Sequence, residues 1–297
     1  MKLNLFSISY AGLWGQDSLP VDDFIGKAAA LGYDGVMLAG KRPHLSVLDT
    51  DERRIGELRA QLERHNVSCD VIGAYTDFSM PSSELPSTEL QIHYLEELAQ
   101  IAQKLGAGVI RVFTAYERAG EAPLASWRRL TGIFQECCDR VGEFGITLAI
   151  QNHHDIAIAT PALIEFLTDI DRVNCKLGFD AWSPALRGED LYEAARMAAP
   201  HTAITTNADY VRFPQFRYQP ELVNYSRNDV DMVRAVPFGD GVIDFKAYFA
   251  GLVEGGFDGI ATYEMCSPLR GGGSIENLDR CAARFLSWMA EHEFAGT

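Results

Sequence analysis

The sequence predicts a single (β/α)₈ barrel spanning residues 1–297. Three observations support this fold class. Eight short apolar runs alternate with amphipathic helical segments along the whole chain, as in parallel strands joined by helices. No low-complexity linker divides the sequence, and there is no early phosphate-binding glycine loop of the kind that marks an open doubly wound sheet. A length of 297 residues suits an α/β barrel built as one domain.

The eight predicted strands are short runs rich in apolar and β-branched residues, separated by glycine and polar residues. If these strands are parallel and close into one barrel, their carboxyl ends converge on a single pocket. The runs are Leu3–Ile8, Gly35–Ala39, Ser68–Ala74, Val109–Phe113, Ile146–Ile150, Lys176–Phe179, Ala203–Thr206 and Ile260–Glu264.

The segments between the strands have the periodicity of amphipathic helices. The clearest is the last, where apolar residues recur at alternating steps of three and four: Ile275, Leu278, Ala282, Phe285 and Met289. Several of these segments end in glycine shortly before the next strand, and glycine suits the left-handed position that follows a helix. These segments are therefore predicted to be the helices of the barrel.

Residues 209–242, which follow the seventh predicted strand, form the one long connection. Connections of more than about 12–15 residues in a compact domain usually have a function of their own or are disordered. This one is rich in aromatic residues and arginine, among them Tyr210, Phe216, Tyr218 and Tyr225. We expect a lid or a subunit contact here, serving either a homo-oligomer or a small partner subunit.

Composition and charge exclude several classes of protein. A formal charge of −15, with no local run of lysine and arginine, disfavours nucleic-acid binding. No apolar run approaches the ~18 residues that a membrane span needs, and residues 1–6 do not resemble a signal peptide. The six cysteines lack the paired spacing of zinc or redox motifs, so we expect reduced thiols. The expected location is the cytoplasm.

Polar residues that could bind a substrate or transfer protons follow most of the predicted strands. In a parallel barrel, catalytic groups lie at these carboxyl ends. Each has a structural alternative: Asp180 could cap a turn, Gln151 could satisfy backbone groups, and His44 could be a solvated loop residue. The candidates are Lys41, His44, Arg111, Gln151, His153, His154, Asp180, Trp182, Glu264 and Arg270.

Three segments near the carboxyl end carry a family resemblance: Pro237–Phe245, Gly256–Gly259 and Tyr263-Glu264. With them, essentially the whole chain resembles the sugar phosphate isomerase/epimerase family of xylose isomerase-like TIM barrels, a group that also includes apurinic endonucleases. The resemblance implies a divalent metal held by Glu, Asp, His and Glu at the ends of strands five to eight. Asp180 and Glu264 match this pattern. The other two positions depart, with Gln151 for Glu and Thr206 for His.

The resemblance implies proton abstraction next to the carbonyl of a keto sugar or sugar derivative. We expect an isomerase or epimerase assisted by Mn²⁺ or Mg²⁺ on Gln151, Asp180 and Glu264, because oxygen donors suit these hard cations. His153 or Glu264 is the expected base, and the sugar is expected to contact Lys41, His44, Arg111, His154, Trp182 and Arg270. Because Gln151 cannot take up a proton at neutral pH, two-base epimerisation is disfavoured.

Two alternatives to an isomerase remain. A lyase or dehydratase would begin with the same proton abstraction and then expel a β-substituent from a keto sugar or 3-keto glycoside, with or without a small partner subunit. A catalytically silent barrel would bind only a sugar or a partner protein. A nuclease is disfavoured by the negative charge of the chain.

Overall fold

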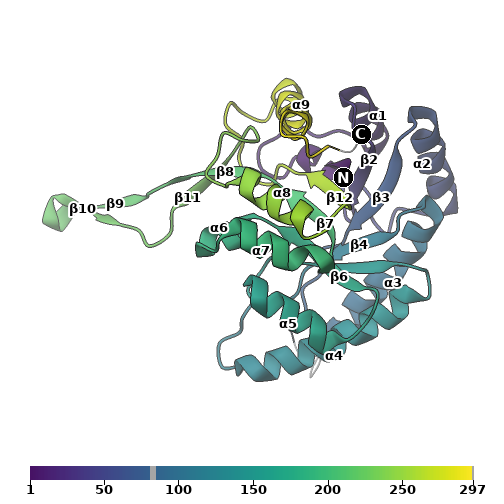
Figure 1. The fold of residues 1–297 in the computed structure, drawn as a ribbon, viewed down its shortest axis with the longest axis horizontal. Coiled ribbons are helices and arrows are strands. Elements are labelled where there is room, and N and C mark those ends of the chain that lie inside the picture. Colours follow the sequence, from purple (N-terminus) through teal and green to yellow (C-terminus); the bar gives the residue numbers. More distant parts are fainter. Residues whose placement is uncertain (81–84, 296–297) are drawn as a thin grey trace.

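The computed structural model describes residues 1–80 and 85–295, and its centre is a closed barrel of eight parallel strands (Figure 1). Neighbouring strands follow the order β1-β12-β7-β6-β5-β4-β3-β2. The (β/α)₈ prediction is thus confirmed, and each of the eight predicted runs overlaps a barrel strand. These strands are β1 (Lys2–Phe6), β2 (Gly35–Ala39), β3 (Ser68–Gly73), β4 (Val109–Val112), β5 (Thr147–Gln151), β6 (Cys175–Asp180), β7 (Thr202–Asn207) and β12 (Ile260–Tyr263).

Helices surround the barrel. Their apolar faces pack on the outside of the strands, and the last helix buries the stripe that its periodicity predicts, including Leu278, Phe285 and Met289. Gly32 and Gly106 end two helices with φ of 94° and 82°, as predicted for left-handed caps. The helices are α1 (Val21–Leu31), α2 (Glu52–His65), α3 (Ser87–Leu105), α4 (Pro123–Gly142), α5 (Thr160–Ile170), α6 (Trp182–Arg187), α7 (Leu191–Ala198), α8 (Phe245–Glu254) and α9 (Ile275–Glu291).

The barrel interior is filled by its own small apolar cluster, separate from the large core between strands and helices. Below this cluster, near the amino ends of β1 and β3, the Lys2 ammonium pairs with Asp70 at 2.7 Å and Asn4 donates to the same carboxylate at 3.0 Å. The amino end of the barrel is therefore closed by side chains. The interior cluster comprises Phe6, Ile8, Ala11, Met37, Ala39, Val71, Ala149 and Ile204.

Most of the long connection after β7 folds into an antiparallel arm. Strand β8 (Asp209–Phe213) pairs with β11 (Met232–Val236), and further out β9 (Phe216–Gln219) pairs with β10 (Asn224–Arg227). Figure 1 shows this arm reaching well away from the barrel. Aromatic residues that favour extended backbone explain the strands, although propensity alone did not show how they would pair.

The base of the arm is fixed by the segment that carries the family resemblance. The Asp209 carboxylate accepts hydrogen bonds from the backbone nitrogens of Gly239 (3.0 Å) and Gly241 (2.8 Å). A Cβ at Gly241 would lie only 1.9 Å from the Asp209 carboxylate oxygen, so a side chain does not fit there. The glycines of this motif therefore hold the point at which the chain leaves the barrel.

Two expectations drawn from composition bear on the fold. Within residues 1–80 and 85–295, no helix has the length and apolar character to cross a membrane. All six cysteines are free thiols, and five of them are buried. The sixth, Cys266, is partly exposed and lies just beyond β12.

Candidate functional site

Three of the predicted polar residues meet at the carboxyl end of the barrel. Gln151 ends β5, Asp180 ends β6 and Glu264 directly follows β12, and all three side chains are buried. The Gln151 amide nitrogen donates to a carboxylate oxygen of Asp180 at 2.9 Å. Parallel strands thus bring together residues that are far apart in the sequence, as the barrel prediction required.

Asp180 is held by a polar clamp between the ends of β5 and β6. The Asn152 side chain accepts from the Asp180 backbone nitrogen at 2.7 Å and donates to the Asp180 carbonyl at 2.8 Å. The second carboxylate oxygen of Asp180 accepts from the Trp182 backbone nitrogen at 2.7 Å. Sequence reasoning missed Asn152, although its place beside Gln151 at a strand end was a signal.

The two buried carboxyls hold their protons unusually tightly. Burial, reinforced by the negative charge of Asp180, raises the pKa of Glu264 to about 7. Burial also raises the pKa of Asp180 to about 6, although hydrogen bonds from Trp182 and Gln151 oppose the shift. Arg111 lowers the pKa of both groups, so its positive charge lies within electrostatic reach of both.

Arg111, on β4, is a cation buried inside the barrel mouth. It is 1 % exposed, and one guanidinium nitrogen donates to the Ala74 carbonyl at 2.9 Å. Its Nε atom is buried and has no hydrogen-bond partner in the part of the chain that the structure describes. The guanidinium carbon lies 4.1 Å from the centre of the Phe113 ring and 5.0 Å from that of Tyr75, in cation–π contact.

Two glycines on neighbouring strands make room for this arginine. A Cβ at Gly73 of β3 would lie 3.0 Å from an Arg111 terminal nitrogen, and a Cβ at Gly178 of β6 would lie 3.3 Å from its Cγ. Glycine inside a strand often marks such a close approach. Gly178 and Asp180 are two residues apart and therefore point to the same face, which places Asp180 on the interior side as well.

Lys41 adds a second positive charge on the same side of the mouth. Its ammonium lies 3.6 Å from the centre of the Tyr75 ring. Partial burial, followed by repulsion from Arg111, lowers the pKa of Lys41. Tyr75 thus contacts both cations, a role that the sequence analysis did not assign to it.

The two predicted histidines lie beside Phe113. Their Nδ1 atoms are 2.9 Å apart, and their ring centres lie 4.9 Å (His153) and 4.6 Å (His154) from that of Phe113. His153 retains solvent exposure, but desolvation by nearby protein atoms, followed by repulsion from His154 and Arg111, lowers its pKa to about 4. The imidazole of His153 is therefore neutral at pH 7 and only weakly basic.

The remaining predicted substrate-binding residues make contacts outside the carboxylate pair. The His44 ring is buried, with Nε2 3.2 Å from the Leu19 carbonyl oxygen, which is a packing role. Trp182 packs against Tyr210 with the rings tilted by 50° and their centres 4.6 Å apart. Arg270 is exposed, and its backbone nitrogen donates to the Ala235 carbonyl at 2.9 Å. Of these three, Trp182 is the one tied to the site, through its backbone bond to Asp180.

A thiol connects the carboxylates to the base of the arm. The Cys266 sulfur lies 3.8 Å from a Glu264 carboxylate oxygen and 2.8 Å from the Tyr210 hydroxyl. Sequence reasoning missed Cys266 as a site residue. Its position two residues after Glu264 was the available signal, because residues so spaced in extended chain share a face.

The donor set does not fit the divalent metal that the sequence analysis expected. The amide nitrogen of Gln151 donates to Asp180, and both Asp180 oxygens already accept hydrogen bonds. Within the described residues, the buried oxygen donors left without a hydrogen-bond partner at these positions are neutral, the amide oxygen of Gln151 and the hydroxyl of Thr206. Thr206, at the position of the implied histidine, offers only a hydroxyl. Among residues 1–80 and 85–295, no three His, Cys, Asp or Glu side chains are grouped so as to hold a metal.

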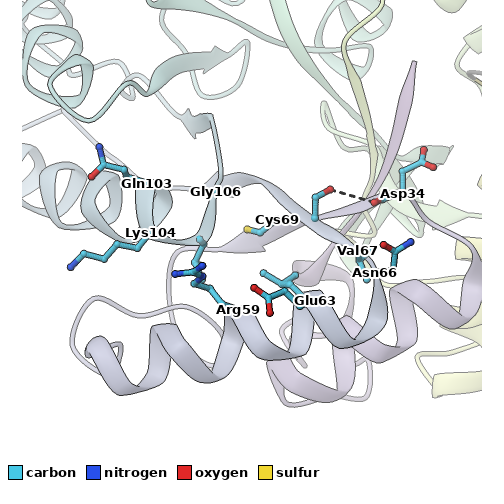
Figure 2. A pocket seen from close by; sticks show the side chains of 12 residues that line it. Asp34, Arg59, Glu63, Asn66, Val67, Cys69, Gln103, Lys104 and Gly106 are labelled. Carbon is cyan, nitrogen blue, oxygen red and sulfur yellow. Dashed lines mark hydrogen bonds between the residues drawn. The ribbon is translucent and has the colours of Figure 1, made fainter.

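A cavity of about 980 Å³ lies away from the barrel mouth. Figure 2 shows it beside α2 and α3, with Arg59, Glu63, Gln103 and Lys104 projecting from these helices near Cys69. It lies by the amino end of β3, whereas reactions in barrels of this kind take place at the carboxyl ends of the strands. Its lining residues carry charges of both signs, and their polar groups do not converge on one point. We therefore place the candidate functional site at the barrel mouth.

Comparisons with known proteins agree with this architecture. Fructoselysine 3-epimerase of Escherichia coli O157:H7 is 23% identical over 157 residues, which are 51% of this chain and 54% of that protein. The chain thus spans about half the length of the curated relatives it matches.

Two solved structures share the fold along nearly the whole chain. The zinc-bound IolI protein superposes with a TM-score of 0.76 at 14% identity, covering 100% of both chains. A probable 3-DHS dehydratase, AsbF of Bacillus anthracis, superposes with a TM-score of 0.73 at 16% identity, covering 97% of this chain and 99% of that one. The sequence profile of the xylose isomerase-like TIM barrel matches residues 25–287, and the chain belongs to that family.

Proposed function

We propose that the protein is an isomerase- or epimerase-like enzyme that removes a proton from the carbon next to the carbonyl of a keto sugar or sugar derivative. One observation carries the proposal: Glu264 is buried at the barrel mouth beside Asp180 and within electrostatic reach of Arg111. A carboxyl in such a place can exchange a proton with a bound substrate. The similarity to fructoselysine 3-epimerase supports the same class of substrate.

Glu264 is the base in this proposal. Its carboxylate takes the proton, the electrons of the C–H bond move to form a carbon–carbon double bond, and the carbonyl oxygen becomes negatively charged. The carboxylic acid then returns the proton to the former carbonyl carbon, while the proton of the neighbouring hydroxyl passes to the former carbonyl oxygen, and the carbonyl is thereby moved by one carbon. A pKa near 7 supports this role, because a catalytic group works best when its pKa is close to the working pH.

His153 fits the role of base less well than Glu264. With its pKa lowered to about 4, the imidazole has little affinity for a substrate proton. Its neighbours Phe113 and His154 instead form one wall of the mouth. We assign His153, His154, Lys41 and Trp182 to contacts with the sugar, for which aromatic faces and polar groups are both suited.

Gln151 favours a second candidate, β-elimination from a keto sugar or 3-keto glycoside. Its amide cannot take up a proton at neutral pH, so the site lacks a second base on the β5 wall. Elimination needs one group only, because protonated Glu264 can return its proton to the departing oxygen. The first step is the same, and only the fate of the enediolate differs.

Solvent exchange tests the shared first step before the product is known. Keto sugars, including D-fructose and D-tagatose, and 3-keto glucosides are incubated with the protein in D₂O, and NMR follows deuterium entering the carbon next to the carbonyl. We expect exchange with the wild type, a loss of about 100-fold or more in Glu264→Gln, and wild-type exchange in the exposed control Glu143→Gln.

Two results would contradict the proposal. Unchanged exchange in Glu264→Gln would remove that residue as the base, and His153→Ala would then test the other predicted base. Binding of a sugar without exchange would show a non-catalytic sugar-binding barrel. Among substrates that do exchange, a product that has lost its β-substituent identifies a lyase, and a rearranged sugar identifies an isomerase.

A further inference from the structure

Arg111 is a buried cation for which the described residues provide no ion-pair partner. Its guanidinium is 1 % exposed, and one of its terminal nitrogens donates a hydrogen bond to a neutral backbone carbonyl, that of Ala74. Within the described residues, Arg111 forms no ion pair with a carboxylate. A buried charge without a close partner destabilises the folded protein. Such a group is best explained by a ligand or reaction that needs a positive charge at this depth.

The site is built to keep this cation in place. Gly73 and Gly178 leave the space that the side chain occupies, while Phe113 and Tyr75 present ring faces to the guanidinium. Arginine remains protonated in proteins at any working pH. The mouth therefore holds a permanent positive charge that requires no bound ion.

The net charge of the site is consistent with Arg111 taking the place of a divalent ion. The ligand set implied by the family resemblance carries three carboxylates, which with a divalent ion sum to −3 + 2 = −1. With both carboxyls ionised, Asp180, Glu264 and Arg111 of the present site also give a net charge of −1. Gln151 adds a hydrogen bond to Asp180 where a third carboxylate would repel it. A divalent ion added to Arg111 would instead face a fixed positive charge.

We propose that this protein works without a metal, and that the buried guanidinium of Arg111 supplies the positive charge for the reaction. The inference rests on the proposed function. Glu264 removes the proton, the C–H electrons shift towards the carbonyl, and the resulting oxyanion accepts a hydrogen bond from the Arg111 Nε–H. This buried donor has no partner among residues 1–80 and 85–295. No electrons leave the substrate, so no oxidant or reductant is needed.

Metal content and thermal unfolding test the first half of the proposal without a substrate. The wild type is purified without chelator, analysed for Mn, Mg and Zn, and melted with and without each ion. We expect well under one metal per chain and no rise in Tm. The double substitution Gln151→Glu with Thr206→His rebuilds the implied ligand set and should acquire a Mn²⁺-dependent rise in Tm; Gln151→Glu alone is used if the double variant does not fold.

Oxalate, a planar dianion that resembles an enediolate, tests the role of Arg111. Calorimetry should show oxalate binding to the wild type, weakened about 10- to 100-fold in Arg111→Met, as expected for the loss of a hydrogen bond to a charged group. Arg111→Lys keeps the charge but moves the donor, so intermediate affinity is expected. The exposed Arg118→Met is the matched control and should bind as the wild type does.

Several results would overturn the proposal. One metal per chain in the wild type, or deuterium exchange abolished by chelation and restored by Mn²⁺, would show a metalloenzyme, with the proposed function intact. Equal oxalate affinity in wild type and Arg111→Met would remove Arg111 from the site. If the metal and oxalate results hold but no sugar exchanges deuterium, the proposed function fails while the assignment of Arg111 as the resident cation stands.

Discussion

Replacing Glu264 by Gln should make the protein more stable, and the gain should grow with pH. The buried carboxyl has a pKa of about 7, against an ordinary value of 4.5. The folded state therefore holds the proton more tightly than the unfolded chain, and it loses relative stability as the pH rises from 4.5 through 7. A difference of about 2.5, at about 1.4 kcal/mol for each pKa unit, corresponds to about 3 kcal/mol when the group is fully ionised.

Most of this penalty falls between pH 5 and pH 8. At pH 5 the folded carboxyl is still protonated, and ionisation of the unfolded chain contributes only about 1 kcal/mol. At pH 8 the folded group is ionised, and the full penalty applies. Glutamine has nearly the same shape and no charge, so the stability gained in Glu264→Gln should increase by about 2 kcal/mol over this range.

Urea unfolding at pH 5 and pH 8 measures the effect as the difference in unfolding free energy between variant and wild type. The exposed Glu143→Gln removes the same charge from the surface and should follow the pH dependence of the wild type. If the free-energy difference for Glu264→Gln were equal at the two pH values, Glu264 would not hold its proton more tightly when folded. The raised pKa of Glu264 would then no longer support its role as the catalytic base.

Four further predictions concern other parts of the molecule. In His153→Ala, deuterium exchange should fall by less than about tenfold if the imidazole only contacts the sugar; a larger loss would restore it as the base. Gly73→Ala should lower the unfolding free energy in urea by about 1–3 kcal/mol, because its Cβ would meet two buried side chains at 2.8 Å. Tyr218→Ser with Tyr225→Ser should leave stability within about 0.5 kcal/mol, and sedimentation should show dissociation if the arm is a subunit contact. Incubation with abasic DNA should give no cleavage, because the net charge of −15 repels phosphates.

The sequence was sufficient to predict the barrel because its evidence is local and repeated. Each strand is a short apolar run. The largest difference between a predicted and an observed strand boundary is two residues, at the end of β1, where Ser7–Tyr10 forms a 3-10 helix. The arm was less predictable. Its aromatic content indicated a function, but the pairing of Tyr218 with Tyr225 depends on contacts that no periodicity encodes. Whether it is a lid or a subunit contact stays a prediction.

Site residues could be predicted from the sequence where they lie directly at the end of a strand. Gln151, Asp180 and Glu264 each follow from the rule that parallel strands present their carboxyl ends together. Alternation was a weaker guide to His153, because the strand ends at Gln151 and the backbone turns at His154, where φ is 69°. Once the chain leaves extended geometry, the rule that every second residue shares a face no longer applies.

The burial of Arg111 shows why the rest of the site could not be predicted from the sequence alone. Its own strand places it on an interior face, but the space for its side chain comes from β3 and β6, whose glycines lie 38 and 67 positions away in the sequence. Two other properties also arise only in the folded mouth: the Arg111 Nε, which has no partner within the described residues, and the hydrogen bond that the Gln151 amide nitrogen donates to Asp180. A position-by-position comparison with the metal-ligand pattern shows only that Gln151 and Thr206 replace two of the implied ligands. The folded site shows in addition that a buried cation, Arg111, lies at the same barrel mouth. The exchange at Gln151 and Thr206 is therefore better understood as a change in where the positive charge comes from than as decay of a metal site.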